Sequence, residues 1–552
     1  MHSTMQITYP DGIEARSFPV GTFVRDIIPK SFHDNELPLL AVYCSNKMMS
    51  LNDRLDISCE CRPIYGDCHT GSQVFRRSLS FVFVMACQEL FPGRRCVISH
   101  TIGHSLFWTF EGMDEVPEEE IDMIRDTMKV IIDSNYAIRR AALSYQEAIS
   151  WCENSNMPLA ADLLKTHNHA RVFMNVCNGF KDRWFSPLVS STGIIKHWDV
   201  RKYRNGLTTH YPGTKTPNCL TPFVDNENLY NAYQAHQKWG ECIDCTSVAS
   251  LNQKLTNGGT LKEFVLVVEA RMRRQLMQIV DNITCDHKLI LISGPSSSGK
   301  TTFSKRLSVH LRAMGRKPVV VSLDDYYVNR VDTPLDSDGE YDFEAVEALD
   351  LPHLNKQLAE LVAGEEVETP IFDFKTGTRK DYGHFVKMPE GGILVMEGLH
   401  ALNERLTETI PREQKFKIFI SPLTQLNIDD HTRIATSDSR LIRRIVRDAK
   451  FRGYSAEASL ERWGSVLRGE ILIYTYQRLA DYCMNSAIEY EMPILKTYAA
   501  PLLKNITPNS CQYGAAQRLL AFMDVFRTAP ASVVPPDSIL REFIGGSYFN
   551  YN

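Results

Sequence analysis

The chain lacks the cysteine spacing of a structural zinc site. It has 14 cysteines, but Cys59 and Cys61 are one residue apart, Cys242 and Cys245 form a single C-x-x-C pair, and no second pair follows at finger-like spacing. We therefore expect most of the cysteines to be reduced thiols, which favours a cytoplasmic location.

Long hydrophobic runs and a strong excess of one charge are also missing. Residues 81–87 are apolar but far below membrane length, so we expect neither a signal peptide nor a membrane span. With 61 basic and 66 acidic residues the net charge is −5, which gives no global attraction to nucleic acid or to an anionic membrane. The other proportions, 43% hydrophobic and 23% charged, are ordinary, and 552 residues predict about three or four domains.

The chain does contain a glycine-rich loop between an apolar strand and a helix start. Residues 289–302 read LILISGPSSSGKTT, which fits the P-loop spacing G-x-x-x-x-G-K-[ST]. Backbone amides of such a loop curl around phosphate oxygens, while Lys300 reaches the β- and γ-phosphates of ATP and Thr301 offers its hydroxyl to Mg²⁺. The predicted ATP-binding residues of the loop are Gly294, Pro295, Ser296, Ser297, Ser298, Gly299, Lys300, Thr301 and Thr302.

Two predicted strands after the loop end in acidic residues. Residues 319–323 lead into Asp324, and residues 393–396 lead into Glu397. In a parallel sheet the carboxyl ends of the strands lie at the phosphate loop, so we expect Asp324 to be the general base and, with Thr301 and Glu397, to bind magnesium. Without the loop, the two acids would be more typical of solvated loop carboxylates.

Four arginines share one face of a predicted helix. Arg440, Arg443, Arg444 and Arg447 follow the spacing i, i+3, i+4, i+7. A charge run is usually a solvated face. Because these like charges are taken to lack acidic partners one turn away, we expect a mobile helix that closes over the transferred phosphate.

The order of the patterns predicts an α/β, multidomain chain with a C-terminal parallel sheet of the P-loop NTPase type and helices on both faces. The second segment mixes a long helical pattern over residues 118–142 with strands at 97–99 and 105–110. The expected segments are a small mixed sheet with one helix (1–63), an α+β domain (64–235), a helical connector (236–285), the P-loop domain (286–528) and a tail (529–552).

Residues 288 to about 505 resemble the uridine kinase and phosphoribulokinase family. The matching segments are residues 294–301, 322–327, 341–343, 372–374, 397–398 and the arginine helix. The resemblance implies an enzyme that uses ATP and Mg²⁺ to phosphorylate a hydroxyl, the 5′-hydroxyl of a nucleoside, with a sugar phosphate as the alternative acceptor. It implies Asp324, Lys300 and Arg447 as catalytic residues and Arg444 and Arg452 at the phosphates. The implied substrate-binding residues are Tyr327, Tyr341, Asp342, Phe372, Phe374 and Arg444.

The chain departs from that family where the nucleobase is recognised. Gly377 stands at the place of the family's base-reading histidine, and Phe372 at the place of its pocket tyrosine. Tyr454 and Arg462 replace an arginine and a glutamine. We therefore expect a pocket that stacks a ring without reading its edge.

The front half resembles two modules of threonyl-tRNA synthetases. Residues 1–63, through the segments 9–12 and 38–43, resemble the TGS domain, a β-grasp module, and residues 64–235 resemble the editing domain that follows it. Arg77 and Phe81 stand where that domain has histidines, and residues 184–188 lack its later Cys and His. The resemblance therefore implies a non-catalytic front half.

Two further interpretations of the front half stay open. His100 and His104 spell H-x-x-x-H, but the surrounding pattern predicts strand, turn and strand, which does not stack both rings on one face for a metal. The alternative function is an RNA- or tRNA-associated module in which ATP binding acts as a switch. The sequence does not fix the oligomeric state.

Overall fold

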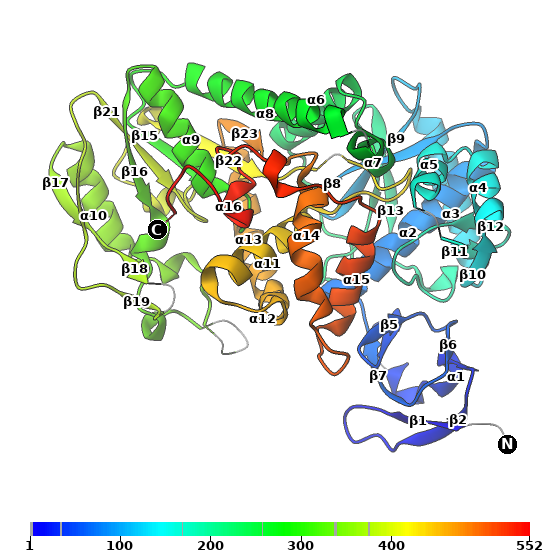
Figure 1. The fold of residues 1–552 in the computed structure, drawn as a ribbon. Coiled ribbons are helices and arrows are strands. Elements are labelled where there is room, and N and C mark those ends of the chain that lie inside the picture. The colour runs from blue at the N-terminus through cyan, green and yellow to red at the C-terminus, as the bar shows by residue number, and fades with distance from the viewer. Residues whose placement is uncertain are drawn as a thin grey trace.

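The computed structural model describes residues 4–33, 36–167, 169–256, 258–335, 339, 341–373, 376–424 and 426–551. Figure 1 shows a small blue N-terminal body below a larger part, in which the C-terminal parallel sheet lies at the left and the antiparallel sheets at the right. Among the described residues no helix is long and apolar enough to cross a membrane.

The N-terminal body is a five-stranded mixed sheet in the order β2-β1-β7-β4-β5. Its core side chains include Met5, Ile7 and Val42. It meets the rest of the chain through Asn46, whose Nδ2 donates to the Pro508 carbonyl at 3.1 Å. The elements are β1 (Thr4–Thr8), β2 (Arg16–Pro19), β3 (Thr22–Phe23), α1 (Val24–Ile27), β4 (Ala41–Cys44), β5 (Lys47–Met49), β6 (Arg54–Leu55) and β7 (Cys59–Ile64).

The second body surrounds α2 (His69–Leu90), which is buried along most of its length because sheets and helices pack on several of its sides. Its sheets have the orders β13-β14-β9-β8 and β10-β11-β12. The other elements are β8 (Cys96–Ile102), β9 (Ser105–Phe110), α3 (Glu118–Asp133), β10 (Arg139–Ser144), α4 (Tyr145–Asn154), α5 (Pro158–Thr166), β11 (Arg171–Cys177), β12 (Phe180–Asp182), β13 (Asp199–Tyr203) and β14 (Gly206–His210).

The helix expected over residues 118–142 is wrong from residue 134 onward. Helix α3 ends at Asp133, and Asn135 takes a left-handed conformation at φ 50° that breaks the helix. Residues 139–144 instead form β10, which pairs in antiparallel register with β11. Pairing with a distant strand outweighs the local helical pattern here.

Three helices lead to the C-terminal sheet: α6 (Glu227–Cys242), α7 (Val248–Thr256) and α8 (Gly258–Asp281). The long helix α8 runs along the top of the view in Figure 1. Its buried side chains join the core that covers one face of the sheet.

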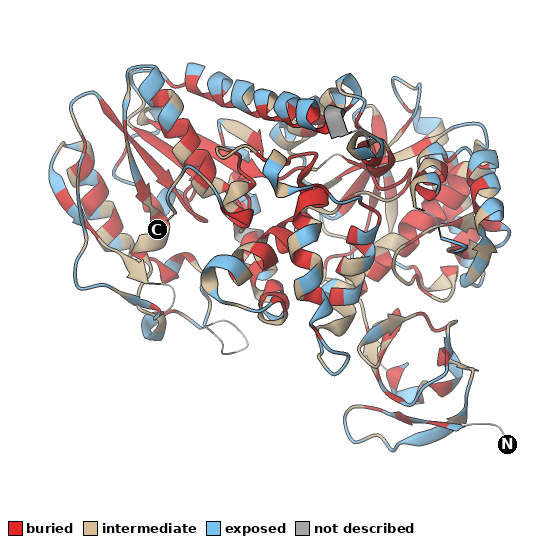
Figure 2. Ribbon diagram, in the orientation of Figure 1, coloured by how far each residue is buried: buried red, intermediate tan, exposed pale blue. Residues whose placement is uncertain are grey.

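The C-terminal sheet has five parallel strands in the order β16-β21-β15-β22-β23. Side chains of the central strand alternate between faces: Ile290 and Ile292 pack with α8 and α9, whereas Leu289 and Leu291 pack with α10. Helices thus cover both faces, and the three inner strands β15, β21 and β22 are buried at every position, whereas the edge strand β16 is partly exposed (Figure 2). The strands are β15 (Leu289–Ser293), β16 (Lys317–Ser322), β21 (Gly392–Glu397), β22 (Lys415–Ser421) and β23 (Tyr482–Asn485).

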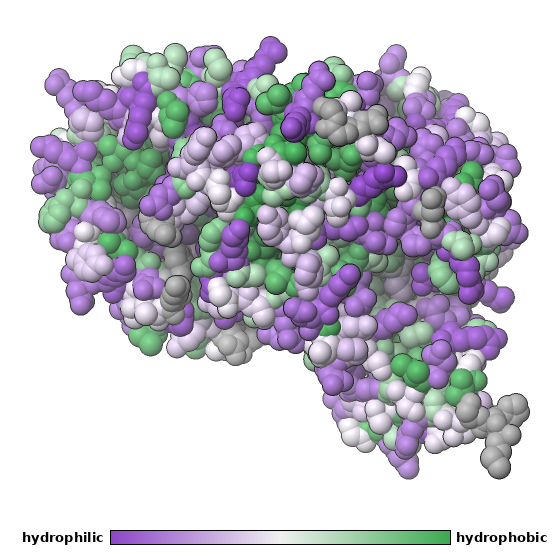
Figure 3. All heavy atoms as spheres, in the orientation of Figure 1, coloured by the Kyte–Doolittle hydropathy of each residue, from purple (hydrophilic) through white to green (hydrophobic). Residues whose placement is uncertain are grey.

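The last segment, residues 529–551, is not a loose tail. Ile539, Leu540 and Phe543 are fully buried and belong to the same core as the sheet. On the face shown in Figure 3, hydrophobic side chains appear mainly in the middle and at the left, among predominantly hydrophilic ones. The remaining elements are α9 (Lys300–Ala313), α10 (Leu351–Val362), β17 (Glu366–Thr369), β18 (Phe372–Asp373), β19 (Thr378–Arg379), β20 (His384–Lys387), α11 (Thr436–Arg447), α12 (Ala456–Glu461), α13 (Trp463–Tyr476), α14 (Glu491–Lys504), α15 (Tyr513–Asp524) and α16 (Arg541–Ile544).

Candidate phosphate and acceptor site

The glycine-rich loop lies at the carboxyl end of β15, the central strand. The chain continues from β15 to β16 on one side, and β22 adds on the other, so the loop sits at the switch point of the sheet. Gly299 has φ +90°, and a Cβ on Gly294 would lie 2.1 Å from the Ile420 carbonyl oxygen. Both glycines are therefore required by the backbone path of the loop.

Side chains behind the loop hold its peptide groups in one orientation. Three consecutive carbonyl oxygens accept hydrogen bonds: Ser296 from Arg440 Nε at 2.9 Å, Ser297 from Arg443 Nη1 at 3.4 Å and Ser298 from Ser486 Oγ at 2.6 Å. Because the N–H and C=O of a trans peptide point in opposite directions, these contacts turn the Ser297 and Gly299 amides away from the arginine helix, whereas the Ser298 amide donates to the Pro295 carbonyl at 3.2 Å. That arrangement suits an anion.

Four side chains with predicted roles meet at this loop. Lys300 Nζ donates to the Gly294 carbonyl at 2.9 Å, and Thr301 Oγ1 donates to Glu397 Oε1 at 3.1 Å. Ser322 at the end of β16 is in register with Glu397 at the end of β21, so Asp324 follows at the same edge of the sheet.

The carboxylates crowd one another. Burial and the Asp324 charge raise the pKa of Glu397 to about 7, although Lys300 acts in the opposite direction. Two carboxylates beside a hydroxyl form an oxygen donor set that a hard cation such as Mg²⁺ prefers, and a bound cation would relieve their repulsion. The residues present therefore fit a magnesium site.

The arginine helix differs from expectation in two ways. Arg440 and Arg443 are fully buried and form ion pairs with Glu470 and Glu491, so α11 is packed against the back of the loop and is not a free lid. Acidic partners also exist, because Asp448 lies one turn after Arg444, at 3.2 Å from its Nε.

Three predicted phosphate-binding arginines gather around that single carboxylate. Asp448 lies 2.8 Å from Arg447 Nη2 and 3.7 Å from Arg452 Nε. Arg444 also donates to Ser296 Oγ of the loop at 2.9 Å. The close approach of these guanidinium groups lowers the pKa of Arg452 to about 10, with Arg447 as the largest cause. Three arginines are therefore held close together beside the loop.

Two of the predicted acceptor residues, Tyr327 and Phe372, lie together, and Tyr327 is close to Asp324. The rings of Tyr327 and Phe372 are 5.7 Å apart, and burial together with the Asp324 carboxylate raises the pKa of Tyr327. Asp342 accepts from the Glu344 amide at 3.0 Å, and Tyr341 is 40% exposed. Phe374 lies outside the described residues.

Arg330 packs on Gly377, which stands at the place of the base-reading histidine of the resembled family. Gly377 has φ +75°, and a Cβ there would lie 2.6 Å from Arg330 Nε. The Arg330 amide also donates to the Gly377 carbonyl at 2.8 Å. Arg462, which replaces a glutamine of the resembled family, lies 4.4 Å from the centre of the Tyr454 ring.

Sequence reasoning missed three glutamates at the loop. Burial and the Glu470 carboxylate raise the pKa of Glu344 to about 8. Gly469 of α13 makes room for this side chain, since a Cβ on Gly469 would lie 2.0 Å from the Cβ of Glu344. Glu470 accepts from the Ser296 amide at 2.9 Å. Residues this far apart in sequence leave no local motif that could have identified them.

The third missed glutamate is Glu542 of α16. Its Oε2 accepts from the Thr302 amide at 3.0 Å and from the Thr302 hydroxyl at 2.7 Å. Tyr551 Oη lies 2.9 Å from the same hydroxyl, and Ile539 packs on Gly299. A carboxylate from the last segment thus binds the N-terminus of α9, where anions are favoured.

In the front half, the structure separates the residues singled out from the sequence. His100 lies in β8 and stacks on Tyr233 at 4.2 Å, and His104 follows in the turn before β9, as the strand-turn-strand pattern predicted. Phe81 and Leu188 are core residues, whereas Arg77 and Trp184 line a cavity.

Comparisons with known proteins match the C-terminal half. Residues 289–469 match the family model described as Phosphoribulokinase / Uridine kinase family. A uridine kinase of Bacillus pumilus (strain SAFR-032) is 29% identical over 181 residues, covering 33% of this chain and 76% of the relative. A uridine kinase of Ligilactobacillus salivarius (strain UCC118) is 29% identical over 180 residues, covering 33% and 75%.

Among solved structures, that of a possible uridine kinase from Bacillus stearothermophilus is similar with 23% identity and a TM-score of 0.24, covering 27% of this chain and 79% of that one. The residues that match the family model run from β15 into α13 and include the P-loop, Asp324, Glu397 and the arginine helix. The C-terminal half therefore carries a P-loop kinase domain of the phosphoribulokinase and uridine kinase type.

Proposed function

We propose that the protein transfers the γ-phosphoryl group of ATP to a hydroxyl of a small molecule, the 5′-hydroxyl of a nucleoside. The observation that carries the proposal is the placement of Asp324 at the sheet edge that holds Lys300, Thr301 and Glu397. A carboxylate at that position can accept the proton of an attacking hydroxyl while the loop holds the phosphates.

Each charged group has one role in this proposal. Lys300 leaves its loop carbonyls to neutralise the β- and γ-phosphates, and Arg447 and Arg444 stabilise the charge spread over the transferred group. Thr301, Asp324 and Glu397 would hold Mg²⁺, which when bound neutralises phosphate oxygens. Asp324 keeps the proton taken from the acceptor.

On the acceptor side, we assign the ribose diol to Asp342 and the base to the rings of Tyr327 and Phe372. Stacking on an aromatic ring tolerates different bases, because every base has an apolar face. Arg330 beside Gly377 offers donors only, whereas a histidine can also accept. These points favour a nucleoside kinase with broad base tolerance; the sugar-phosphate acceptor is the alternative.

We propose that the front half does not catalyse the reaction. The parallel pairing of β1 with β7 within a mixed sheet supports the TGS-like assignment of residues 1–63. The editing-like assignment of residues 64–235 comes with Arg77 and Phe81 in place of the histidines, which supports an inactive domain.

The experiment is a screen of purified protein with ATP and Mg²⁺ against uridine, cytidine, adenosine, guanosine and ribulose 5-phosphate. We expect ADP formation that depends on a nucleoside and yields its 5′-monophosphate. Lys300→Ala should abolish the turnover while the protein stays folded. Product formed only from the sugar phosphate would favour the alternative, and turnover by Lys300→Ala equal to that of the native protein would contradict the kinase proposal.

A further inference from the structure

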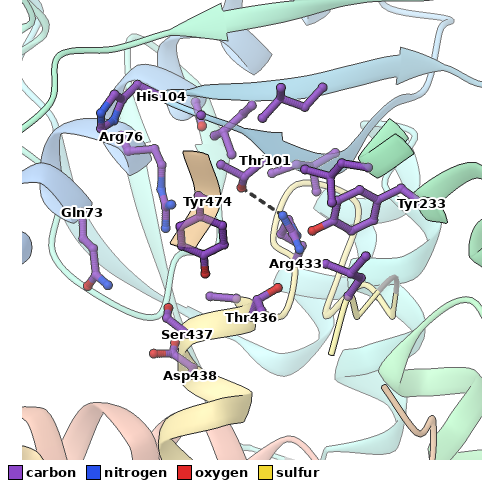
Figure 4. A pocket seen from close by; sticks show the side chains of 18 of the residues that line it. Gln73, Arg76, Thr101, His104, Tyr233, Arg433, Thr436, Ser437, Asp438 and Tyr474 are labelled. Carbon is purple, nitrogen blue, oxygen red and sulfur yellow. Dashed lines mark hydrogen bonds between the residues drawn. The ribbon is translucent and has the colours of Figure 1, made fainter. Parts of the chain in front are cut away.

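A cavity of about 720 Å³ lies between the front and C-terminal halves, and the P-loop residues do not line it. This volume is within the usual range for small-molecule sites, which are common at domain interfaces. Figure 4 shows Gln73 and Arg76 of α2 and His104 facing Tyr233, Arg433, Tyr474 and the first turn of α11 across the cavity. Segments from both halves are therefore needed to form it.

The lining carries more positive than negative charge. Five arginines line the cavity against two carboxylates, and both carboxylates already have arginine partners: Asp438 binds Arg518 at 2.7 Å and 2.8 Å, and Asp225 binds Arg204 at 2.6 Å. His431 also lines it, but faces Asp182 at 3.0 Å. The arginines without an ion-pair partner among the described residues are Arg76, Arg77, Arg433 and Arg478.

Several buried polar atoms in the lining lack a hydrogen-bond partner within the described part of the chain. They include Nε and Nη2 of Arg77, the hydroxyl of Ser80, which is 1% exposed, and the hydroxyl of Thr432. Burial and the neighbouring Arg76 lower the pKa of Arg77 to about 9. Leaving such groups unsatisfied costs about 1–3 kcal/mol each, so a ligand that accepts hydrogen bonds would be stabilised there.

Helix α11 points its N-terminus into the same cavity. Its cap residue Ala435 makes no side-chain cap, and Thr436 and Ser437 of the first turn line the cavity. The positive end of a twelve-residue helix adds to the attraction for an anion.

The other part of the lining is apolar and aromatic. Tyr233 stacks on His100 and lies 5.8 Å below the Arg433 guanidinium, which is held by Thr101 Oγ1 at 2.9 Å. Such a surface suits the face of a flat ring. The apolar lining residues include Ile98, Ile102, Leu229, Phe419, Ile428 and Phe522.

We propose that this cavity binds a small organic anion, a flat apolar body that carries a phosphate or a carboxylate. The anionic group binds Arg77, the Ser80 hydroxyl and the first turn of α11, and the ring lies against Tyr233 and Arg433. The site is separate from the proposed kinase site, and the inference does not depend on kinase activity.

The test is calorimetric titration of the full chain carrying Lys300→Ala, so that the P-loop contributes little, with phenyl phosphate, phenylacetate and the neutral benzyl alcohol. We expect one site that binds phenyl phosphate or phenylacetate at least about 10-fold more tightly than benzyl alcohol. The more tightly bound of the two acids identifies the anionic group.

Arg77→Met should weaken binding of the anion about 10-fold or more, because it removes a charged donor to the anionic group. Arg433→Met should also weaken binding, by a smaller factor, because it removes a guanidinium group that packs against the ring. Arg171→Met, an exposed change on β11, should leave the affinity unchanged. If a cavity variant does not fold, quenching of Trp184, which lines the cavity, reports binding in protein that keeps both arginines, and Trp184→Phe should remove the signal. Equal binding of benzyl alcohol, or anion binding unaffected by both arginine changes, would overturn the proposal.

Discussion

At the scale of single residues, the carboxylates around the glycine-rich loop set its affinity for phosphate. Glu542 accepts from the amide and the hydroxyl of Thr302, at the helix terminus that the proposed ATP site uses. Negative charge is already crowded there, since burial and neighbouring carboxylates raise the pKa of Glu397 to about 7 and that of Glu344 to about 8. In the proposed ATP site, the nucleotide would therefore have to displace the Glu542 carboxylate.

Glu542→Ala should tighten ATP binding by roughly 5-fold or more, because it removes a charge-assisted contact that competes with the nucleotide. The dissociation constant of ATP, measured by calorimetry without acceptor, checks this. Asp537→Asn, in the same segment but paired with Arg273, is the control and should change little. Weaker ATP binding by Glu542→Ala would mean that Glu542 supports the loop and does not compete with ATP.

Gly377 and the neighbouring Arg330 predict that the proposed kinase discriminates only weakly between nucleobases. Because Gly377 has no side chain that could read the base, and the neighbouring Arg330 side chain only donates, we expect kcat/KM for uridine and cytidine to agree within about 10-fold. Parallel kinetics with the two nucleosides checks this. A preference on the order of 10⁴-fold for uridine would show that another group reads the base edge.

At the scale of elements, α11 carries two kinds of arginine. Arg440 and Arg443 form buried ion pairs and hold the back of the loop, whereas Arg447 lies with Arg444 and Arg452 around Asp448. The sequence spacing correctly predicted a helix with these residues on it. It could not show which arginines are buried, because their partners Glu470 and Glu491 come from α13 and α14.

Arg443→Met should destabilise the protein by about 3–5 kcal/mol, since it leaves the Glu491 carboxylate buried without its partner. Arg447→Met should instead lower kcat roughly 10²-fold and change stability by less than about 1 kcal/mol. Urea denaturation and steady-state kinetics on both variants check this. Recovery of stability in the double variant Arg443→Met, Glu491→Met would support the ion pair. Loss of turnover in Arg443→Met with no loss of stability would contradict it.

The local sequence pattern was sufficient to predict segments whose conformation does not depend on distant parts of the chain. The strand, loop and helix around Lys300 and the turn between β8 and β9 were predicted from residue order alone. The helix predicted over residues 134–142 was wrong, because the left-handed conformation of Asn135 ends the helix and the following residues pair with β11. Similarly, Cys44 could not be linked to Cys61 from spacing, yet the pairing of β4 with β7 brings their sulfur atoms to 3.0 Å.

At the scale of the whole molecule, a short loop after β22 joins the two halves. Asp430 accepts from Arg95 Nε at 2.7 Å and from the Ala160 amide at 3.0 Å, and His431 Nδ1 lies 3.0 Å from Asp182. These contacts, like Glu542 and the cavity, depend on chain segments hundreds of residues apart. They therefore could not be predicted from any single segment of the sequence.

The pair of His431 and Asp182 predicts a pH dependence of stability. Burial alone would lower the pKa of His431, but Asp182, with Asp430 and Cys96 adding smaller contributions, raises it to about 9. Since the folded pKa lies above the unfolded value of about 6.5, this stabilisation is fully present below pH 6.5 and is lost as pH rises through about 9. Asp429, in the same loop, has its pKa raised to about 7 by burial and by Asp182, and so titrates in a lower range.

We therefore expect native protein to exceed His431→Gln in unfolding free energy by roughly 2–3 kcal/mol at pH 6.5 and by much less at pH 10. Chemical denaturation of both proteins at several pH values checks this. The exposed His33→Gln serves as control and should follow the native curve. A difference that stays constant from pH 6.5 to pH 10 would contradict a charged His431.

The central claim is that Asp324 is the base of a phosphoryl transfer, and the most direct measurement is the effect of Asp324→Asn on kcat and on ATP affinity. We predict that kcat falls by about 10²–10⁴-fold while the dissociation constant of ATP changes by less than about 10-fold, since a general base acts on the acceptor. The exposed Asp332→Asn is the matched control and should retain native kcat. A normal kcat in Asp324→Asn with collapsed ATP affinity would contradict the claim and leave Asp324 as a magnesium ligand alone.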